Sequence, residues 1–329
     1  MRRPWLAPFM PLYAAGLALR NRRIESGWEP VRRLRCPVVS IGNLSTGGSG
    51  KTPLTIELAK ALKLRGQRVD VLSRGYGRQS KMAARVRPDG VAEDFGDEPL
   101  LIARETGVPV YVAPQRYDAG MLAEANANRA AGEKQLPIVH LLDDGFQHRQ
   151  LARDLNILLL DRQDWQDCLL PAGNLREPLK AAWRAGVIAI PGNDLELEDE
   201  LRVWGWQKPV WRLRRTMEDL AVNGPVATFC GIARPEQFFA GLEAAGVKLA
   251  FRRAFPDHFT YTRAVLENLL TEARKTGAKA LITTEKDLVR MGKLALIFPD
   301  SMPLVATRLR IEIEEQDSAL EWLIEQLAP

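Results

Sequence analysis

The stretch SIGNLSTGGSGKTP, residues 40–53, decides the fold class of this chain. An apolar, β-branched run (CPVVSIG, 36–42) leads into it, and a helical pattern (LTIELAKALKLRG, 54–66) follows it. A strand, a glycine-rich loop and a helix in this order form the loop that binds nucleotide phosphates. The usual pattern is G-x-x-x-x-G-K-[ST], and Ser45 occupies its first position here. The sequence therefore predicts a phosphate-binding loop (P-loop) of unusual form.

Each residue type in this loop has an expected task. Glycines allow successive backbone N–H groups to point into one concavity, which suits phosphate oxygens. We expect Lys51 to bridge phosphate oxygens and the Thr52 hydroxyl to bind Mg²⁺. The predicted nucleotide-binding residues are Gly47, Gly48, Ser49, Gly50, Lys51 and Thr52.

A second motif, LPIVHLLDDGFQHR (136–149), ends an apolar run with two adjacent carboxylates. Phosphate-loop enzymes keep a metal-holding acidic residue at such a strand end. Asp143 and Asp144 repel each other unless a cation lies close by, so we expect one of them to hold Mg²⁺. A solvated turn or a helix cap is the alternative. Gln147 follows within one turn, and His148 either faces the same cleft or forms structural hydrogen bonds.

Three weaker motifs offer further candidates. Asp97, in FGDEP (95–99), is either a helix cap or a base that takes a proton from an attacking hydroxyl. His258, in FPDHF, could orient such a base and share its proton. Glu177, in LPAGNLREP (170–178), is a candidate metal or substrate ligand. TTEKD (283–287) lacks the spacing of the guanine-reading N-K-x-D motif, which argues against a GTPase.

The order of predicted elements indicates an α/β protein with two domains. Near-continuous apolar strands alternating with helices predict a parallel sheet covered on both faces. From about residue 200 the sequence pattern changes to that of a β-ribbon, and a smaller α/β unit then begins. The predicted parts are an N-terminal segment (1–30), a P-loop domain (31–205), a hinge or ribbon (206–223) and a C-terminal α/β domain (224–329).

The basic charge of the chain is confined to its N-terminus. The net charge is +5, and residues 1–35 alone carry +6, so the remainder sums to −1. This distribution argues against nucleic-acid binding. Residues 4–19 are apolar but shorter than the roughly 20 residues of a spanning helix. A signal peptide or a helix packed on its own domain is possible; we favour a segment lying on an anionic membrane surface. Three widely spaced cysteines argue against a disulfide framework and fit a reducing cytoplasm.

Taken in order, these motifs resemble one family. GNLSTGGSGKTP, SRGYGR, GDEP, DDGFQHR, GNLREP, FPDHF and TTEKD run from residue 42 to 287. The chain is similar to the tetraacyldisaccharide 4′-kinases, the lipid A 4′-kinases of Gram-negative bacteria. Ser45 fits that family's own form of the loop.

The resemblance implies transfer of the γ-phosphoryl group of ATP, with Mg²⁺, to the 4′-hydroxyl of tetraacyldisaccharide 1-phosphate, giving lipid IVA. It implies two α/β/α domains with mainly parallel sheets, joined by a β-ribbon hinge, at the cytoplasmic face of the inner membrane. No obligate protein partner is expected. The implied roles are phosphate and Mg²⁺ binding by Lys51 and Thr52, a base (Asp97) assisted by His258, and metal or phosphate contacts from Asp143, Asp144, Gln147 and Glu177.

Two other functions remain open from the residues. A membrane-associated P-loop ATPase switch would carry an extra lysine near the start of the loop, where this chain has Ser45 and Thr46. A soluble small-molecule kinase would need no membrane segment.

Overall fold

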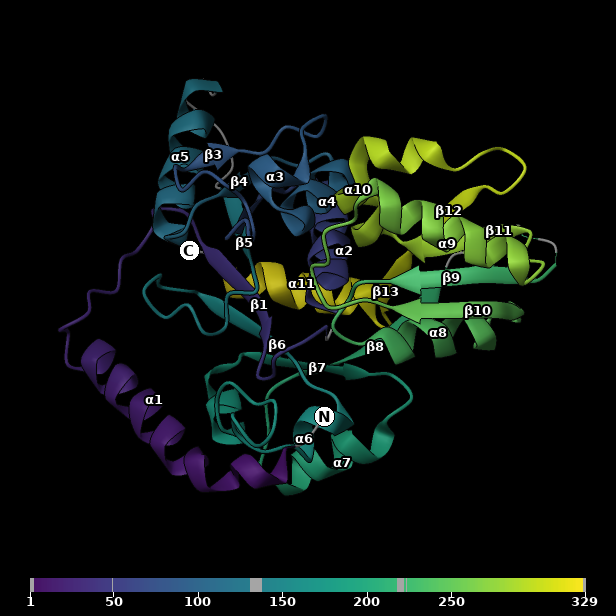
Figure 1. The fold of residues 1–329 in the computed structure, drawn as a ribbon. Helices are drawn as coiled ribbons and strands as arrows, with labels where there is room; N and C mark the ends of the chain where they lie inside the picture. Colours follow the sequence, from purple (N-terminus) through teal and green to yellow (C-terminus); the bar gives the residue numbers. More distant parts are fainter. Residues whose placement is uncertain (1–2, 49, 131–137, 218–221, 223, 328–329) are drawn as a thin grey trace.

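The computed structural model describes residues 3–48, 50–130, 138–217, 222 and 224–327 of the 329-residue chain. Among these residues, the strands form one nine-stranded and one four-stranded sheet (Figure 1). The large sheet has the order β13-β8-β7-β6-β1-β5-β2-β4-β3, and the small sheet β10-β9-β11-β12. Neighbouring strands are parallel except in the pairs β3–β4 and β8–β13. The prediction of an α/β fold with mainly parallel sheets is confirmed.

The bounds of the elements follow the chain. The strands are β1 (Val38–Asn43), β2 (Arg68–Ser73), β3 (Ala84–Arg85), β4 (Val110–Val112), β5 (Ile138–Asp143), β6 (Leu155–Leu159), β7 (Val187–Pro191), β8 (Val210–Met217), β9 (Val226–Cys230), β10 (Leu249–Ala254), β11 (Ala280–Thr284), β12 (Leu304–Thr307) and β13 (Leu309–Ile313). The α-helices are α1 (Met10–Glu25), α2 (Lys51–Leu64), α3 (Ala92–Phe95), α4 (Asp97–Thr106), α5 (Arg116–Ala130), α6 (Arg162–Trp165), α7 (Leu195–Val203), α8 (Pro235–Ala244), α9 (Arg263–Lys275), α10 (Glu285–Met291) and α11 (Gln316–Leu327). Three 3₁₀-helices are described: η1 (Pro4–Phe9), η2 (Leu179–Arg184) and η3 (Gly292–Ile297).

The centre of the large sheet places the P-loop beside the acidic motif. Every residue of β1 is buried, as expected for a β-branched strand inside a covered parallel sheet. Strand β1 lies between β5 and β6, with Ile41 opposite Asp143 in the register. Because these strands are parallel, their carboxyl ends meet at one edge of the sheet. The loop after Asn43 and the carboxylates after Leu142 therefore lie side by side.

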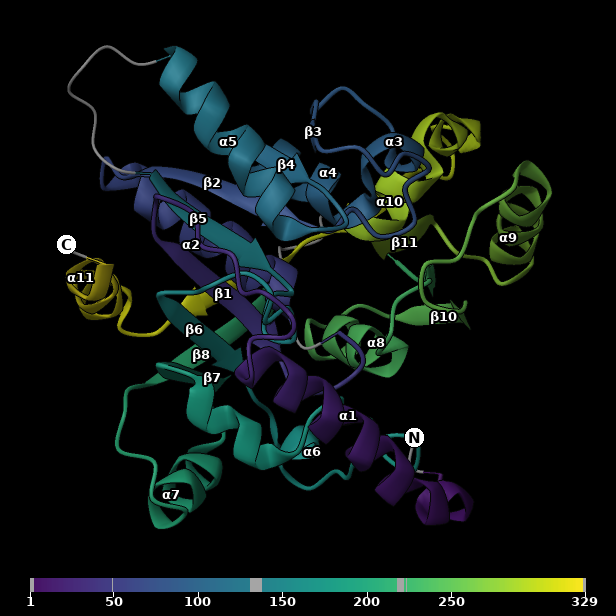
Figure 2. The ribbon, with the colours of Figure 1, turned by 90° about the vertical axis from the view of Figure 1, so that its left-hand side faces the viewer.

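Helices cover both faces of each sheet. One face of the large sheet packs on α2, α4 and α11, and the other packs on α5, η2 and α7. The small sheet packs on α9 and η3 on one face and on α8 on the other. We call the part of the chain around the nine-stranded sheet the large unit and the part around the four-stranded sheet the small unit. Helix α1 runs along the outside of the large unit in both views (Figures 1 and 2), and Ile24 is its one buried residue. None of the described helices combines the length and apolar character that a membrane crossing requires.

The end of the chain corrects the expectation that residues 224–329 form one unit. Strand β13 pairs antiparallel with β8 and extends the large sheet, not the small one. The physical reason is packing: Ile311 and Ile313 join Leu320 and Leu323 of α11 in the hydrophobic core of the large sheet. Strand β8, predicted as part of a hinge or ribbon (206–223), is itself a strand of this sheet and buries Trp211 and Leu213. The chain thus leaves the large unit after β8 and returns to it at β13.

This return makes a prediction about stability. Replacing the fully buried Leu323 with alanine should lower the free energy of unfolding by about 2–5 kcal/mol, because a large core side chain is lost. Hydrogen exchange should accelerate in β8, β13 and α2 and stay unchanged in β9 and β11. Leu296→Ala, at an exposed position in η3, is the matched control. Faster exchange confined to β9 and β11 would contradict the assignment of α11 to the large unit.

Candidate active site

The P-loop joins β1 to α2 through glycines in conformations that other residues avoid. Gly47 and Gly50 have φ angles of 124° and 94°, and a Cβ on Gly50 would lie 2.7 Å from Ile311 Cδ1. Gly48 lines the same concavity, and Thr52 is buried in the first turn of α2. Ser49, predicted to bind nucleotide, lies outside the described residues. The local geometry is that of a phosphate cradle at a helix N-terminus.

The Lys51 ammonium group lies over this cradle. Its Nζ atom donates hydrogen bonds to Asn43 Oδ1 (3.1 Å) and to the Gly47 carbonyl oxygen (3.3 Å). It is 3.7 Å from Asp144 Oδ1. These contacts hold the charge at the mouth of the loop, where it can meet a phosphate oxygen.

The two adjacent carboxylates after β5 lie in opposite electrostatic environments. Asp143 Oδ1 accepts a hydrogen bond from Thr55 of α2 (3.1 Å), whereas Oδ2 is buried with no hydrogen-bond partner among the described residues. Burial, and then the charges of Glu98 and Asp144, raise the pKa of Asp143 to about 7. A buried carboxylate oxygen without a donor is costly unless a cation or a proton satisfies it. Asp143 and the Thr52 hydroxyl therefore fit an oxygen-binding cation such as Mg²⁺.

Asp144, in contrast, is surrounded by cations. Burial alone would raise its pKa, but Lys51, Arg176 and Arg116 hold the pKa well below its ordinary value. Arg176 Nη2 lies 3.1 Å from Asp144 Oδ1, and Asp144 adopts a left-handed backbone conformation (φ 47°). Such strained conformations of non-glycine residues concentrate at functional sites. Asp144 therefore stays ionised and holds the cationic side chains in place.

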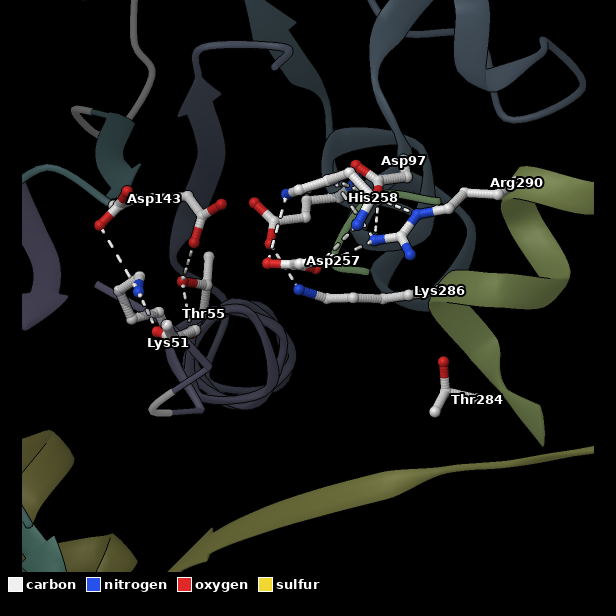
Figure 3. Close-up of polar contacts among 12 residues, drawn as sticks. Lys51, Thr55, Asp97, Asp143, Asp257, His258, Thr284, Lys286 and Arg290 are labelled. Atoms are coloured by element: carbon white, nitrogen blue, oxygen red, sulfur yellow. Dashed lines mark hydrogen bonds and ion pairs between the residues drawn. The ribbon is translucent and has the colours of Figure 1, made fainter. Parts of the chain in front are cut away.

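The small unit brings His258 to Asp97. Asp97 begins α4 and is 5% exposed, and His258 Nδ1 lies 3.2 Å from its Oδ2 atom. Arg290 of α10 donates from Nε to the same oxygen (2.6 Å), so two side chains of the small unit hold this carboxylate (Figure 3). The residue pattern indicated Asp97 and His258 as a possible pair, whereas Arg290 was not predicted. Arg290 follows Asp287 by three positions, about one turn of a helix, and this spacing was the signal that could have found it.

These contacts set the charge of the pair. Burial alone would raise the pKa of Asp97, but the hydrogen bond from His258 and the charge of Arg290 hold the pKa well below its ordinary value. The bond to Asp97 raises the pKa of His258 in turn. His258 also has positive φ (57°), and its ring lies 4.9 Å from that of Tyr76. Asp97 is thus an ionised acceptor that faces a histidine proton.

The TTEKD motif organises the small unit and ties it to the large one. The Asp287 carboxylate accepts hydrogen bonds from the Tyr261 hydroxyl (2.9 Å) and the Gly231 amide (3.1 Å). Lys286 forms an ion pair with Glu98 of α4. These contacts give the TTEKD motif a structural role next to the Asp97–His258 pair. This role is consistent with the motif's lack of the guanine-reading spacing.

Three sequence-predicted residues lie behind the cavity. Gln147 donates to the carbonyl oxygen of Asn43 (2.8 Å) and so supports the end of β1. Burial, with the charges of Arg116 and Arg153, lowers the pKa of His148 to about 3, so its ring is neutral. Glu177 is buried 2.6 Å from Arg184, and as a cation ligand it would have to leave that arginine. None of the three is among the described residues that line the cavity.

The P-loop, the carboxylates and His258 face one cavity of about 790 Å³ between the two units. Its volume suits a nucleotide together with part of a second substrate. Arginines that the sequence analysis missed contribute strongly to its lining. They are Arg74, Arg116, Arg176, Arg215 and Arg234. For Arg74 and Arg234 the available signal was a glycine shortly after a strand, Gly75 after β2 and Gly231 after β9. Their charges make the cavity suitable for anionic groups.

The Asp97–His258 pair predicts a pH-dependent contribution to stability. The pKa of His258 is raised in the folded state, so protonated His258 stabilises the fold. This contribution to the free energy of unfolding is fully present below the unfolded-state pKa of about 6.5, and it is lost as the pH rises through the folded-state pKa. The difference in melting temperature between wild type and His258→Gln should therefore be larger near pH 6 than near pH 9. A difference that is equal at both pH values would show that the pair does not carry this charge.

Comparison with known proteins agrees with this geometry. The family model described as "LpxK: Tetraacyldisaccharide-1-P 4′-kinase" matches residues 2–328. A tetraacyldisaccharide 4′-kinase of Koribacter versatilis is 40% identical over 330 residues, covering 96% of this chain and 97% of the relative. The same-named protein of Aquifex aeolicus is 35% identical, with 96% of each chain covered.

A solved structure extends this similarity to three dimensions. The crystal structure of LpxK from Aquifex aeolicus, described as an "apo" form in complex with ATP, superimposes with a TM-score of 0.74. It is 33% identical in sequence and covers 98% of both chains. A match along nearly the whole length, at this identity, leaves no large part of the chain outside the family. The chain belongs to the tetraacyldisaccharide-1-P 4′-kinase family.

Proposed function

We propose that this protein transfers the γ-phosphoryl group of ATP to the 4′-hydroxyl of tetraacyldisaccharide 1-phosphate and forms lipid IVA. The observation that carries the proposal is that Lys51 of the P-loop and His258 of the small unit line one cavity, and that His258 contacts the buried carboxylate of Asp97. A phosphate cradle alone would serve any ATPase, but a buried carboxylate–histidine pair across from it suits a hydroxyl acceptor. The relatives are named for a tetraacyldisaccharide and its 4′ position, which supports this choice of acceptor.

The phosphate side of the reaction rests on positioning and charge. The transition state of phosphoryl transfer spreads negative charge over the transferred group, and preorganised cations stabilise it. In this proposal Lys51 and the amides of Gly48 and Gly50 hold the phosphates. Asp143 and Thr52 are the residues that would hold Mg²⁺, which neutralises phosphate charge when it is bound. Arg176, at 3.1 Å from Asp144, adds a further positive charge beside the loop.

The acceptor side rests on the Asp97–His258 pair. A sugar hydroxyl is a poor nucleophile at neutral pH, and a positioned base accelerates such transfers by about 10²–10⁴-fold. Asp97 alone, with a depressed pKa, is a weak base. His258 lines the cavity, so in its neutral form it can take up the hydroxyl proton while Asp97 stabilises the resulting imidazolium. Closure of the small unit would exclude water and limit wasteful hydrolysis of ATP.

The N-terminal helices are proposed to hold the protein at the cytoplasmic face of the inner membrane. Trp5, Phe9, Leu12 and Leu19 are exposed on η1 and α1, among the basic residues of this segment. Apolar side chains flanked by arginines suit an anionic bilayer surface. The inner face of α1 contacts the active-site loops, since Tyr13 donates to the Arg176 carbonyl oxygen (2.9 Å) and Arg20 to that of Gln147. Membrane contact would thereby bring the cavity to its lipid substrate.

A label-transfer assay tests the reaction. Wild-type protein with γ-labelled ATP, Mg²⁺ and detergent-dispersed tetraacyldisaccharide 1-phosphate should give a labelled bisphosphorylated lipid. Lys51→Ala should lower this rate by at least about 100-fold, because it removes charge neutralisation in the transition state. Lys60→Ala, on the same helix but paired with Glu105, should be near normal. Labelled inorganic phosphate without labelled lipid would reject the proposal and favour an ATPase switch.

A vesicle-binding assay tests the membrane contact separately. Reversing the charges of the exposed Arg22 and Arg23 to glutamate should weaken sedimentation with anionic vesicles, since each basic residue near such a surface contributes about 1 kcal/mol. The matched control reverses Arg263 and Arg274, exposed on α9 of the small unit. Equal loss of binding in the two variants, or in neither, would contradict a membrane-facing N-terminus.

A further inference from the structure

A second cluster of polar side chains lies under α5, away from the cavity. It consists of Cys36, which precedes β1, Asp70 of β2, Glu124 of α5 and His140 of β5. His140 is fully buried, Asp70 and Glu124 are 3% and 7% exposed, and Cys36 is half-buried. Helix α5 covers β2 and β5 here (Figure 2). None of the four lines the active-site cavity, and the proposed function uses none of them.

The side chain of His140 is oriented by Asp70 through one of its two ring nitrogens. His140 Nδ1 lies 2.6 Å from Asp70 Oδ1. Its Nε2 atom is buried and makes no hydrogen bond to any described residue. A carboxylate on one ring nitrogen fixes the tautomer that leaves the other nitrogen free, which is the usual arrangement around a metal-binding histidine. An unpartnered buried nitrogen is otherwise costly.

Two further donor atoms converge on this nitrogen. Glu124 Oε1, Cys36 Sγ and His140 Nε2 lie within 4.8 Å of one another. The distance from Nε2 to Glu124 Oε1 is 3.7 Å, too long for a hydrogen bond. It is close to the separation of about 3.3–3.4 Å between nitrogen and oxygen ligands of a tetrahedral zinc ion. The backbone amides of Arg35 and Cys36 donate to Glu124 Oε1 (2.8 and 2.9 Å), so Glu124 also fixes the position of Cys36.

We propose that Cys36, Glu124 and His140 bind one divalent transition-metal ion, with Asp70 as the residue that orients His140. A sulfur, a nitrogen and an oxygen donor together suit Zn²⁺ better than Mg²⁺ or Ca²⁺, which prefer oxygen ligands. Three protein ligands leave a fourth position for water, on the half-exposed side of Cys36. Binding releases the proton of the Cys36 thiol to solvent, together with the proton of His140 Nε2 where that nitrogen carries one.

The charges of the cluster favour a cation. The buried Asp70 Oδ1 lies 2.6 Å from one ring nitrogen of His140, and Glu124 Oε1 lies 3.7 Å from the other. The pocket therefore stabilises positive charge, and either a proton on His140 or a metal ion can supply it. The alternative to the proposal is a buried imidazolium ion between two carboxylates, with Cys36 as a bystander.

A metal ion at this place would stabilise the frame of the active site without entering the reaction. It would join the segment before β1 to α5 and β5, and β1 and β5 carry the P-loop and Asp143 at their other ends. His140 precedes Asp143 by three residues, roughly 10 Å along the strand. The two side chains point to opposite faces of the sheet, since their positions differ by an odd number.

Cobalt(II) is the probe that separates this site from the active site. The metal-free full-length protein is titrated with Co²⁺ in excess Mg²⁺, which occupies oxygen-ligand sites. Binding through Cys36 gives a sulfur-to-cobalt charge-transfer band in the near ultraviolet, with a stoichiometry of one. The band should be absent in Cys36→Ser and present in Cys168→Ser, the matched control at another half-buried cysteine. No band in the wild type, or an equal band in Cys36→Ser, would overturn the proposal.

Zinc affinity and melting temperature provide the second readout. Glu124→Gln keeps an oxygen that can accept the two backbone bonds, so it should fold, yet it should bind Zn²⁺ at least about ten-fold more weakly. Asp70→Asn should weaken binding by about 10–100-fold without removing the cobalt band. One equivalent of Zn²⁺ should raise the melting temperature of the wild type and not that of Cys36→Ser. A zinc-independent melting temperature in the wild type would favour the buried imidazolium.

Discussion

The structure depends on one buried carboxylate that the two units share. Asp97 opens a helix of the large unit, and both side chains that hold its Oδ2 atom come from the small unit. A carboxylate that is 5% exposed needs such partners, because burying an unpaired charge costs several kcal/mol. The ion pair of Lys286 with Glu98 lies beside it. The contact of Asp97 with His258 and Arg290 therefore both joins the two units and assembles the candidate base. If the units separate, the candidate base is lost as well.

Across the cavity, the same principle gives two neighbouring carboxylates different tasks. The Asp144 carboxylate forms ion pairs with Lys51 and Arg176 and stays ionised. Asp143 has one oxygen held by Thr55 and the other without a partner, and burial keeps its pKa near 7. A site that contains both types offers a fixed anion to position cationic side chains and a buried oxygen for an incoming cation. The cationic arginines around it complete a lining suited to several phosphate oxygens.

The sequence was sufficient to predict the features that depend on a single short segment of the chain. The P-loop, the strand before it and the acidic strand end each lie within one short segment, so residue type and spacing specify them. Long-range packing decided the rest. Arg290 contacts Asp97 across 193 positions, because α10 packs against α4, and an arginine on a helix ordinarily suggests solvent. The alternation of Leu309–Ile313 fits a strand in either sheet, and only the core around Trp211 and Leu323 determines which. Glu177 has the residue type of a metal ligand, yet the fold places it beside Arg184.

We propose that Asp97 and His258 act as one unit on the acceptor hydroxyl, and a double-mutant cycle on the turnover number tests this directly. Asp97→Ala, His258→Ala and the double variant would be compared with the wild type at saturating ATP and lipid, with ATP affinity measured in parallel. The double variant should lose no more turnover than the more damaging single substitution, with ATP affinity nearly unchanged, because removal of either partner already disables the pair. Losses that multiply in the double variant would contradict it and show that the two residues contribute independently.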